Sequence, residues 1–385
     1  MNGLRKTLIC GLFASMALAA CGGGGDGGTP TGTLSVHMTD APACGFDHVY
    51  VTVSKVRVNT SSAAGDGDGG WSDITLATPQ KIDLLTLTNG VLTTLGQTTL
   101  PAGQYQQVRL VLASNQGNTL ANSVVVSGTT TEQALATPSA VQSGLKIIRP
   151  FTVPANQTVD LVLDFNACKS VVLQGNGSYA LKPVVTATPT AVSGSIDGYV
   201  ATGQAGATVY AEQNGQVIRG TVADSTGHFM LSPLVQSTTN GNYDIVIAQT
   251  NETTGVVTSV PVLVGATTHV STSSTPITLA ASTMNTVSGT ATASAYASLR
   301  ALQTTTSGTY EIASTNANLT TGAYSMSLPV AAPMVGAYTG TLPVSLTAAT
   351  ASAGLYTIEA DAASGATQST GVNITSGAQT ANFSF

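Results

Sequence analysis

The sequence predicts an all-β protein made of tandem β-sandwiches, preceded by a short targeting segment and a flexible tether. Three observations lead to this fold class. Apolar residues make up 42% of the 385 residues and charged residues only 8%, against roughly 25% charged residues in an average soluble protein. Apolar residues alternate with threonine and serine over many short runs, which is the period of a strand with one buried face. Clusters of glycine, asparagine and aspartate separate these runs and indicate turns.

Residues 1–20 have the pattern of a secretory signal. Arg5 and Lys6 precede an apolar run that ends at Leu18, and this run is too short for a membrane span. It closes with the sequence LAAC, whose cysteine is Cys21. This ending resembles the lipobox of bacterial lipoproteins. The resemblance implies cleavage before Cys21, a diacylglyceryl group on its thiol and acylation of the new amine, so we expect a membrane partner through this lipid.

A flexible tether follows at residues 21–32, CGGGGDGGTPTG. Its composition is that of a random coil, with a root-mean-square reach of roughly 20 Å. In the Gram-negative lipoproteins that the lipobox resembles, an aspartate after the lipidated cysteine tends to retain the protein at the inner membrane. Gly22 stands at that position here. The resemblance therefore implies a cell-envelope protein of the outer membrane, without saying which side of that membrane it faces.

The first sandwich is expected over residues 33–187. Its opening strand, 33–39, alternates with Leu34, Val36 and Met38 on one face. In the second strand, 48–58, the apolar parity switches near Ser54 or Lys55, which indicates a β-bulge. The Gly/Asp/Ser segment 60–70 is expected to be a solvent-exposed loop, and the Asn-Gly pair at 89–90 a tight turn. Further strands are expected at 104–112 and 159–165.

Cysteine usage suggests one disulfide. Cys10 leaves with the signal and Cys21 carries the lipid, so Cys44 and Cys168 remain. An exported protein lies in an oxidising compartment, which favours pairing over two free thiols. The chain-entropy model assigns such a long loop about 5 kcal/mol of stabilisation. We therefore expect a Cys44–Cys168 disulfide that staples the first sandwich.

Three runs in this first unit are distinctive: GTLSVHMTDAP, KIDLLTLTNGVLTTLG and PAGQYQQVRLVL. They resemble a domain family of exported bacterial lipoproteins that is known only as a domain of unknown function. The resemblance implies a β-rich domain in an envelope lipoprotein. It implies no activity.

The second sandwich is expected over residues 192–282. Its segments VSGSIDGYV, GATVYAEQNGQVIRGTVADSTGHFMLSPL and GNYDIVIAQ resemble the carboxypeptidase regulatory-like domain. That family implies a small transthyretin-like β-sandwich without a peptidase centre. The fold class is thus tandem sandwiches of the immunoglobulin/transthyretin type.

Residues 287–385 resemble a diverged copy of the second sandwich. The run Val-Ser-Gly at 192–194 recurs at 287–289. The run Gly-Leu-Tyr at 354–356 parallels Gly-Asn-Tyr at 241–243. Two copies predict a stalk with the domains arranged like beads on a string. Alternatively, the tail is low-complexity β sequence, since its motifs are weaker and its insert at 329–350 is apolar.

Seven of the eleven tyrosines lie two residues after a glycine. Glycine permits a tight turn into a strand, and tyrosine can fill the mouth of a sandwich while its hydroxyl reaches loop backbone. The alternative is an aromatic platform for a ligand. The structural interpretation is favoured, because the tyrosines are scattered evenly: Tyr105, Tyr179, Tyr243, Tyr310, Tyr324, Tyr338 and Tyr356.

Charge excludes one class of partner. Arg5 and Lys6 leave with the signal, so the formal net charge falls from −6 to −8. An acidic chain without a basic stripe cannot neutralise phosphates. We therefore expect no nucleic-acid partner.

The chain contains no recognisable catalytic motif. The four histidines, His37, His48, His228 and His269, form no HExxH pair for zinc, and no Gly-x-Ser-x-Gly elbow is present. Asp47 and His48 could in principle pair with a serine, but adjacent Asp and His residues often arise by chance. We expect no enzyme activity and no cofactor.

Two pairs of acidic residues are the remaining candidates for chemistry. Asp160 and Asp164 share one face of a strand, at a separation close to that of paired glycosidase carboxylates, but alternation assigns them to the solvated face. Asp66 and Asp68 in the Gly-rich loop are a weak Ca²⁺ candidate, because an EF-hand needs further ligands and a closing glutamate. A solvated loop is the better interpretation of that segment.

Three functions remain in order of preference. The first is a non-catalytic, lipid-anchored envelope protein with a structural or adhesive role, which would bind another envelope protein. The second is a carbohydrate-binding envelope lipoprotein, which Trp71 or tyrosines exposed in one groove would favour and buried rings would oppose. The third is a hydrolase, which would require His37, His48 or His228 beside an acid in a cleft.

Overall fold

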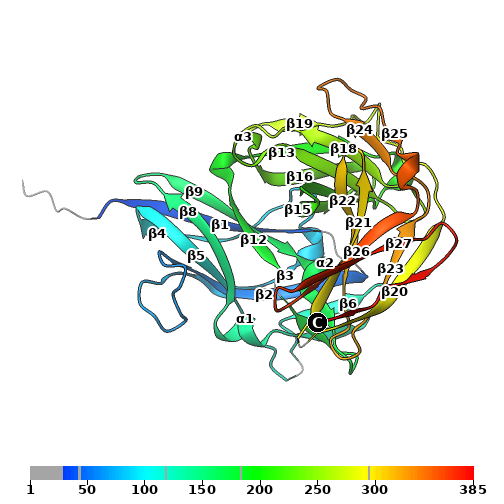
Figure 1. Cartoon of the computed structure of the whole chain (residues 1–385). Coiled ribbons are helices and arrows are strands. Elements are labelled where there is room, and N and C mark those ends of the chain that lie inside the picture. The colour runs from blue at the N-terminus through cyan, green and yellow to red at the C-terminus, as the bar shows by residue number, and fades with distance from the viewer. Residues whose placement is uncertain (1–28, 42–44, 118, 183, 294) are drawn as a thin grey trace, which may run out of the picture.

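The computed structural model describes residues 29–41, 45–117, 119–182, 184–293 and 295–385. These residues form three β-sandwiches, and the buried apolar residues fall into three clusters, chiefly one per sandwich. Figure 1 shows the first sandwich in blue to green, the second in green to yellow and the third in yellow to red. The predicted fold class, tandem β-sandwiches, is confirmed.

The first sandwich packs a four-stranded sheet on an eight-stranded one. The smaller sheet has the order β12 (Val185–Pro189), β9 (Thr158–Asn166), β1 (Thr31–Ala41), β4 (Thr93–Pro101). The larger sheet has the order β10 (Val171–Leu173), β11 (Tyr179–Leu181), β7 (Glu132–Ala136), β6 (Ser123–Val126), β2 (Phe46–Asn59), β5 (Gly103–Leu112), β8 (Leu145–Val153), with β3 (Ser72–Asp83) also paired to β2.

The predicted bulge in β2 is present. The register of β2 shifts between Val53 and Lys55 against both β3 and β5. Because of this extra residue, Val53 before the shift and Val56 after it are both fully buried. The parity switch in the sequence therefore records a single strand that keeps one buried face.

The second sandwich pairs a three-stranded sheet with a larger one. The small sheet has the order β16 (His228–Val235), β13 (Ser193–Tyr199), β19 (Thr267–His269). The other sheet runs β15 (Gln216–Val222), β14 (Thr208–Gln213), β17 (Tyr243–Ala248), β18 (Gly255–Val260), β24 (Met334–Ala337), β25 (Thr347–Ala348).

The third sandwich repeats this topology. One sheet has the order β23 (Ala323–Pro329), β20 (Met284–Thr292), β28 (Gln379–Thr380), with β29 (Phe383–Ser384) also on β20. The other runs β22 (Gly308–Asn316), β21 (Ala297–Thr305), β26 (Leu355–Ala362), β27 (Thr367–Asn373). β20 pairs antiparallel with β23 and parallel with β28, as β13 does with β16 and β19. The two units thus share one strand order.

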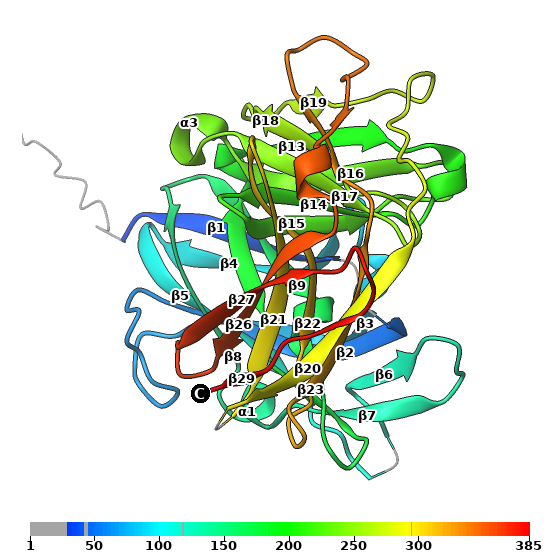
Figure 2. The same ribbon diagram turned by 45° about the vertical axis from the view of Figure 1, so that its right-hand side comes forward.

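The insert at 329–350 joins the second and third sandwiches. β24 lies in this insert, yet it pairs in parallel with β18 of the second sandwich, and Tyr338, Val344 and Leu346 pack on the second core. In return, Val246 and Val256 of the second sandwich belong to the third core. The expected beads-on-a-string stalk is therefore wrong. The apolar insert completes a neighbour's sheet, and Figure 2 shows this orange segment reaching over the second sandwich.

Helices are short and lie between strands. They are η1 (Leu84–Thr86), α1 (Pro138–Gln142), α2 (Ala167–Ser170), η2 (Thr190–Val192), η3 (Thr202–Gln204), α3 (Ser237–Asn240) and η4 (Thr350–Ser352). Within the described residues, none is long and apolar enough to cross a membrane.

Candidate functional site

The lipidation candidate Cys21 lies outside the described residues, together with residues 22–28 of the tether and Cys44. The last two tether residues, Thr31 and Gly32, already belong to β1. Cys168 lies in α2, directly after β9. The parallel register of β1 and β9 brings Ala41 opposite Asn166, and the backbone N–H of Ala167 donates to the Asp40 carboxylate at 3.0 Å. β1 and β9, which precede Cys44 and Cys168 in the sequence, therefore end side by side.

The loop with Asp66 and Asp68 is folded around a tryptophan. The guanidinium groups of Arg57 and Arg109 stack on the Trp71 ring, with 4.8 Å between each guanidinium carbon and the ring centroid. The Asp66 carboxylate pairs with Arg57 at 3.1 Å, and Asp68 accepts from the backbone of its own loop at 2.7 Å. Both acids thus have protein partners, and within the described residues no group of three His, Cys, Asp or Glu side chains could hold a metal ion.

Each of the four histidines lies beside an aspartate. The distances from ring nitrogen to carboxylate are 3.2 Å for His37–Asp160, 2.6 Å for His48–Asp83, 3.6 Å for His228–Asp197 and 2.5 Å for His269–Asp197. His48 therefore pairs with Asp83 rather than with its neighbour Asp47, whose carboxylate accepts from the backbone of Gly128.

These histidine pairs hold neighbouring strands together on outer faces. His37 belongs to β1 and Asp160 to the adjacent β9, and His269 of β19 reaches Asp197 of the adjacent β13. Four cavities lie between sandwiches in the described part of the chain, and none of them has a histidine in its lining. The requirement for a hydrolase, a histidine and an acid together in a cleft, is not met at these places.

The two acids on β9 have different environments. Asp160 is half-exposed beside His37, but the Asp164 side chain is only 6% exposed and lies 2.6 Å from Arg219 of the second sandwich. The expectation of a solvated face is therefore wrong for Asp164, because β15 of the second sandwich covers that end of the strand. Burial raises the pKa of the Asp164 carboxyl and the Arg219 guanidinium partly offsets this.

The tyrosines that follow a glycine are mostly buried. Tyr243 and Tyr356 hold equivalent places in the two repeats, and their hydroxyls donate to the carbonyls of Val235 at 2.8 Å and Pro329 at 2.7 Å. Tyr105 and Tyr324 likewise donate to backbone carbonyls. These rings are structural, as the favoured interpretation predicted, and they offer no platform to a ligand.

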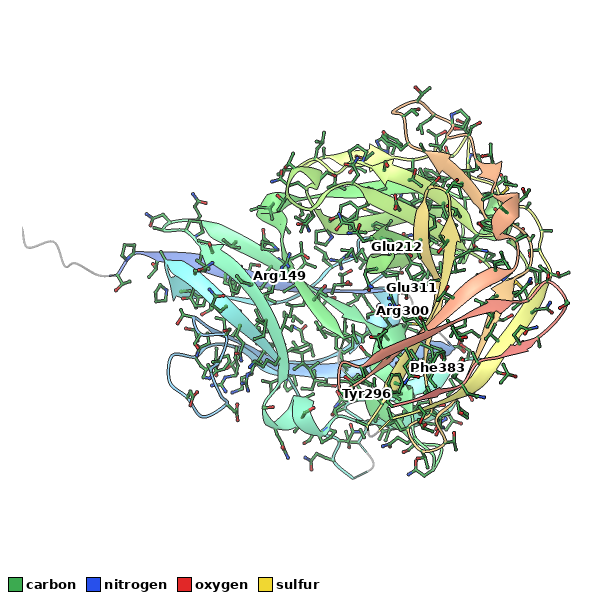
Figure 3. All side chains as sticks on the ribbon, viewed as in Figure 1. Arg149, Glu212, Tyr296, Arg300, Glu311 and Phe383 are labelled. Atoms are coloured by element: carbon green, nitrogen blue, oxygen red, sulfur yellow. The ribbon has the colours of Figure 1, made fainter. Side chains whose placement is uncertain are left out.

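A buried polar cluster joins the three sandwiches. The Lys169 ammonium of α2 lies 2.6 Å from Glu311 of β22, whose side chain is 1% exposed. The other oxygen of Glu311 lies 3.3 Å from Arg300 of β21, and the backbone N–H of Glu311 donates to Glu212 of β14 at 3.0 Å. Lys169, Glu212, Arg300 and Glu311 are called the junction cluster below; Figure 3 shows Glu212, Glu311 and Arg300 in a column near the centre of the molecule.

Glu212 is the group in this cluster with the most perturbed titration. Burial, followed by the nearby Glu311 carboxylate, raises the pKa of Glu212 to about 8, and the backbone hydrogen bond from Glu311 opposes the shift. One carboxyl oxygen of Glu212 is buried without a hydrogen-bond partner within the described residues. A carboxyl group in this position is neutral at pH 7.

A cavity of about 480 Å³ lies next to the junction cluster. Its floor is the outer face of β21, β22, β26 and β27, and its walls come from α2 and from the β14–β15 hairpin. All three sandwiches thus contribute to it. Three further cavities lie between sandwiches: one of about 360 Å³ between the first and second, one of about 320 Å³ between the first and third, and one of about 220 Å³ between the second and third.

Sequence reasoning missed both the junction cluster and this cavity. Lys169, Glu311 and Arg300 are ordinary strand and turn residues in sequence, and no spacing links them. One signal was present: in a chain with only 8% charged residues, a charge on an otherwise alternating strand needs a partner. Arg300 and Glu311 are such charges.

Comparison with protein families finds one match. Residues 31–183 match the family described as a domain of unknown function, DUF4382. The match covers the first sandwich up to β11 and agrees with the resemblance stated for that unit. No curated protein matches the chain.

Several solved structures are similar to parts of the chain. A cohesin–X-dockerin complex from Acetivibrio cellulolyticus is 26% identical over 23% of this chain and 58% of that chain, with a TM-score of 0.19. The chain thus spans less than two thirds of that protein. A streptococcal ancillary pilin is 9% identical over 91% of this chain and 98% of that one, with a TM-score of 0.16. The minor pilin GBS52 of Streptococcus agalactiae is 12% identical over 64% and 95%, with a TM-score of 0.16.

Proposed function

We propose that this protein is a non-catalytic, lipid-anchored component of the cell envelope with a structural or adhesive role. The observation that carries the proposal is the junction cluster: buried ion pairs join the first and third sandwiches, and a buried hydrogen bond to Glu212 adds the second, so that the three form one body. Such a body presents fixed surfaces and loops at the end of a tether. The histidine–aspartate pairs support the same function, because they tie strands together instead of lining a cleft.

Anchoring is proposed through the lipid on Cys21, at the outer membrane. Its support is the lipobox sequence and Gly22. One acyl chain gives marginal membrane binding, and three chains at about 0.8 kcal/mol per buried methylene give a stable anchor. The Cys21→Ser protein is expected to leave the membrane fraction, and metabolic labelling with a palmitate analogue to fall to background. A Cys21→Ser protein that still fractionates with membranes would contradict anchoring.

We further propose that the folded body is displayed on the cell surface, and this display has its own test. Protease added to intact cells should digest the folded body if it faces the medium, whereas a periplasmic body should survive until the outer membrane is opened. A cytoplasmic protein serves as the control for lysis. If the protease digests the body neither on intact cells nor after the outer membrane is opened, the anchoring proposal is unaffected, but the adhesive role is contradicted.

We also propose that Cys44 is the disulfide partner of Cys168. The support is the secretory pattern of the chain, which favours pairing of its two remaining cysteines, and the parallel register that ends β1 and β9 side by side shortly before Cys168. Mass spectrometry of the non-reduced digest should find the 44–168 linked peptide. Finding Cys168 alkylated in the native protein would contradict this.

The repeat in the second and third sandwiches is proposed to descend from the carboxypeptidase regulatory-like domain. Their common strand order supports duplication of one unit, and the shared Gly-x-Tyr position supports it further. The lineage adds no chemistry to the proposed function.

A further inference from the structure

We propose that the 480 Å³ cavity beside the junction cluster binds a neutral saccharide of one or two sugar units. This inference deepens the proposed adhesive function by naming a class of ligand, and it does not depend on the lipid anchor. The volume lies within the range of small-molecule sites, about 300–1,000 Å³, which occur preferentially where domains meet. Here all three sandwiches line the space.

The cavity is closed on one side by a rigid floor. Ser298 and Arg300 of β21 project from it, with Ser314 and Asn316 of β22 beside them. These strands pair directly with one another over their whole length, so the spacing of their side chains is fixed. A floor of paired strands pre-organises its polar groups, which lowers the entropy cost of binding.

The charges around the cavity are already paired. Arg300 contacts three carboxylates: Glu311 of β22 at 3.3 Å, Glu359, and Asp361 at 3.8 Å. Lys169 is held by Glu311 at 2.6 Å. An anion or a cation would therefore meet a compensated charge and gain little for the loss of its hydration. A neutral ligand with many hydroxyls suits such a site better.

The remaining polar groups match hydroxyls. Glu359 and Asp361 lie two residues apart on β26, so they face the same side, and their side chains are 21% and 37% exposed. One oxygen of Asp361 accepts from Thr367 at 2.7 Å, which orients the other. Sugar hydroxyls can donate to such carboxylates, in hydrogen bonds to charged acceptors that are stronger than neutral ones. The Gln216 amide on the opposite wall adds a donor and an acceptor.

A second cavity, of about 320 Å³, continues the first. Both are lined by Ser314, Thr315 and Asn316, but the second also contains Phe46 and Tyr179 of the first sandwich. These two rings meet edge to face with 5.5 Å between centroids. An aromatic surface beside a polar pocket gives the apolar face of a second sugar ring a place to pack. The two cavities together therefore suit a disaccharide.

Most tyrosines in Gly-x-Tyr motifs have buried rings and offer no glycan platform. The saccharide site does not depend on these buried rings. Its hydroxyl partners come from β26 and the hairpin, and its aromatic surface comes from Phe46 and Tyr179, which are half-buried. Of these two, only Tyr179 belongs to the Gly-x-Tyr set.

The test is ligand-observed NMR on the purified full chain. Maltose, cellobiose, lactose and chitobiose are offered one at a time, and saturation-transfer signals are followed by titration. At least one disaccharide should bind. Asp361→Asn keeps the shape of the side chain and removes a charged acceptor, so affinity for that sugar should fall about tenfold. Gln216→Ala, at an exposed hairpin residue, should weaken binding about threefold without affecting folding.

Gln104→Ala is the matched control, since this glutamine is likewise exposed and lies on β5 away from the cavity. Its affinity should equal that of the unaltered chain. Binding of none of the four sugars would overturn the inference, and so would a signal that survives both cavity variants or binding of inorganic phosphate in place of sugar. If no sugar binds while protease still removes the protein from intact cells, the saccharide site fails and the proposed function stands.

Discussion

Glu212 shows how a residue that is unremarkable in sequence acquires unusual chemistry from its place in the fold. Its carboxyl group faces Glu311, Asp244, Lys169 and Tyr210, and burial is the largest influence on it. The pKa in the folded state is raised from 4.5 to about 8. The folded protein therefore holds one more proton than the unfolded chain between these values.

A pH dependence follows from Glu212. Because its folded pKa is raised, its contribution to stability is complete below pH about 4.5 and is lost progressively up to pH about 8. The slope is at most about 1.4 kcal/mol per pH unit. Glu212→Gln should flatten this decline, which urea denaturation at pH 5 and pH 8 would measure. An identical decline in the variant would contradict the assignment.

The paired tyrosines of the repeats allow a matched comparison. Tyr243→Phe and Tyr356→Phe each remove one buried hydrogen bond to a backbone carbonyl. Each should lower the free energy of unfolding by about 1 kcal/mol. Tyr338→Phe, at a half-buried member of the same motif, should cost less. Thermal denaturation distinguishes them, and equal losses at all three positions would show that the hydroxyl bonds contribute nothing specific.

At the scale of elements, the turn at 89–90 of the first sandwich packs against the second sandwich. Both residues have positive φ, 59° for Asn89 and 74° for Gly90, as the Asn-Gly signal predicts. The Asn89 side chain accepts from the backbone N–H of Met230 at 2.8 Å and donates to the His228 carbonyl at 3.1 Å. A Cβ at Gly90 would lie 2.9 Å from the Met230 sulfur. The turn therefore fits the second sandwich closely.

Asn89→Gly tests the contribution of this contact to stability. Glycine keeps the positive φ and deletes the side chain, which leaves the Met230 N–H without its partner and should cost about 1–3 kcal/mol. Asn214→Gly is the control, because Asn214 has a similar φ of 53° in the β14–β15 turn and is exposed. Calorimetry should show a lower melting temperature only for Asn89→Gly. Equal melting temperatures of the two variants would contradict a stabilising role for the Asn89 side chain.

Features within a single element could be predicted from the sequence, but which part of another sandwich packs on that element could not. The bulge in β2 follows from the valine parity, and the loop at 60–70 from its glycines, because both signals are local. The burial of Asp164 could not be predicted, since the residue that covers it, Arg219, lies in another sandwich. Strand alternation reports which face is polar, but it cannot report that a second domain covers that face.

At the scale of the whole molecule, the Asp164–Arg219 pair fixes the first sandwich to the second. Both side chains are at most 6% exposed. Arg219→Met would leave a buried carboxylate without its partner and should destabilise the protein by about 3–5 kcal/mol at pH 7. Adding Asp164→Leu should recover most of this loss. Chemical denaturation of the three proteins measures the coupling, and a double variant as unstable as the single one would contradict the account.

The candidate site belongs to this largest scale, which is why no motif announced it. Lys169, Gln216 and Arg300 come from three different sandwiches, and their proximity depends on how those sandwiches dock. The fold class followed from composition and alternation. The docking depends on a few buried charges and on one insert, whose apolar character is visible in the sequence but whose partner strand is not.

That insert has a consequence for the order in which the chain matures. β18 has β17 on one side, and its other edge is covered only when β24 arrives, after β20 to β23 of the third sandwich have been made. During synthesis the second sandwich therefore carries a bare, valine-rich strand edge, of the kind that recruits other chains. A chain that ends after Ser282 should therefore self-associate. In the complete chain β24 covers the exposed edge of β18, so the third repeat acts as an intramolecular chaperone for the second.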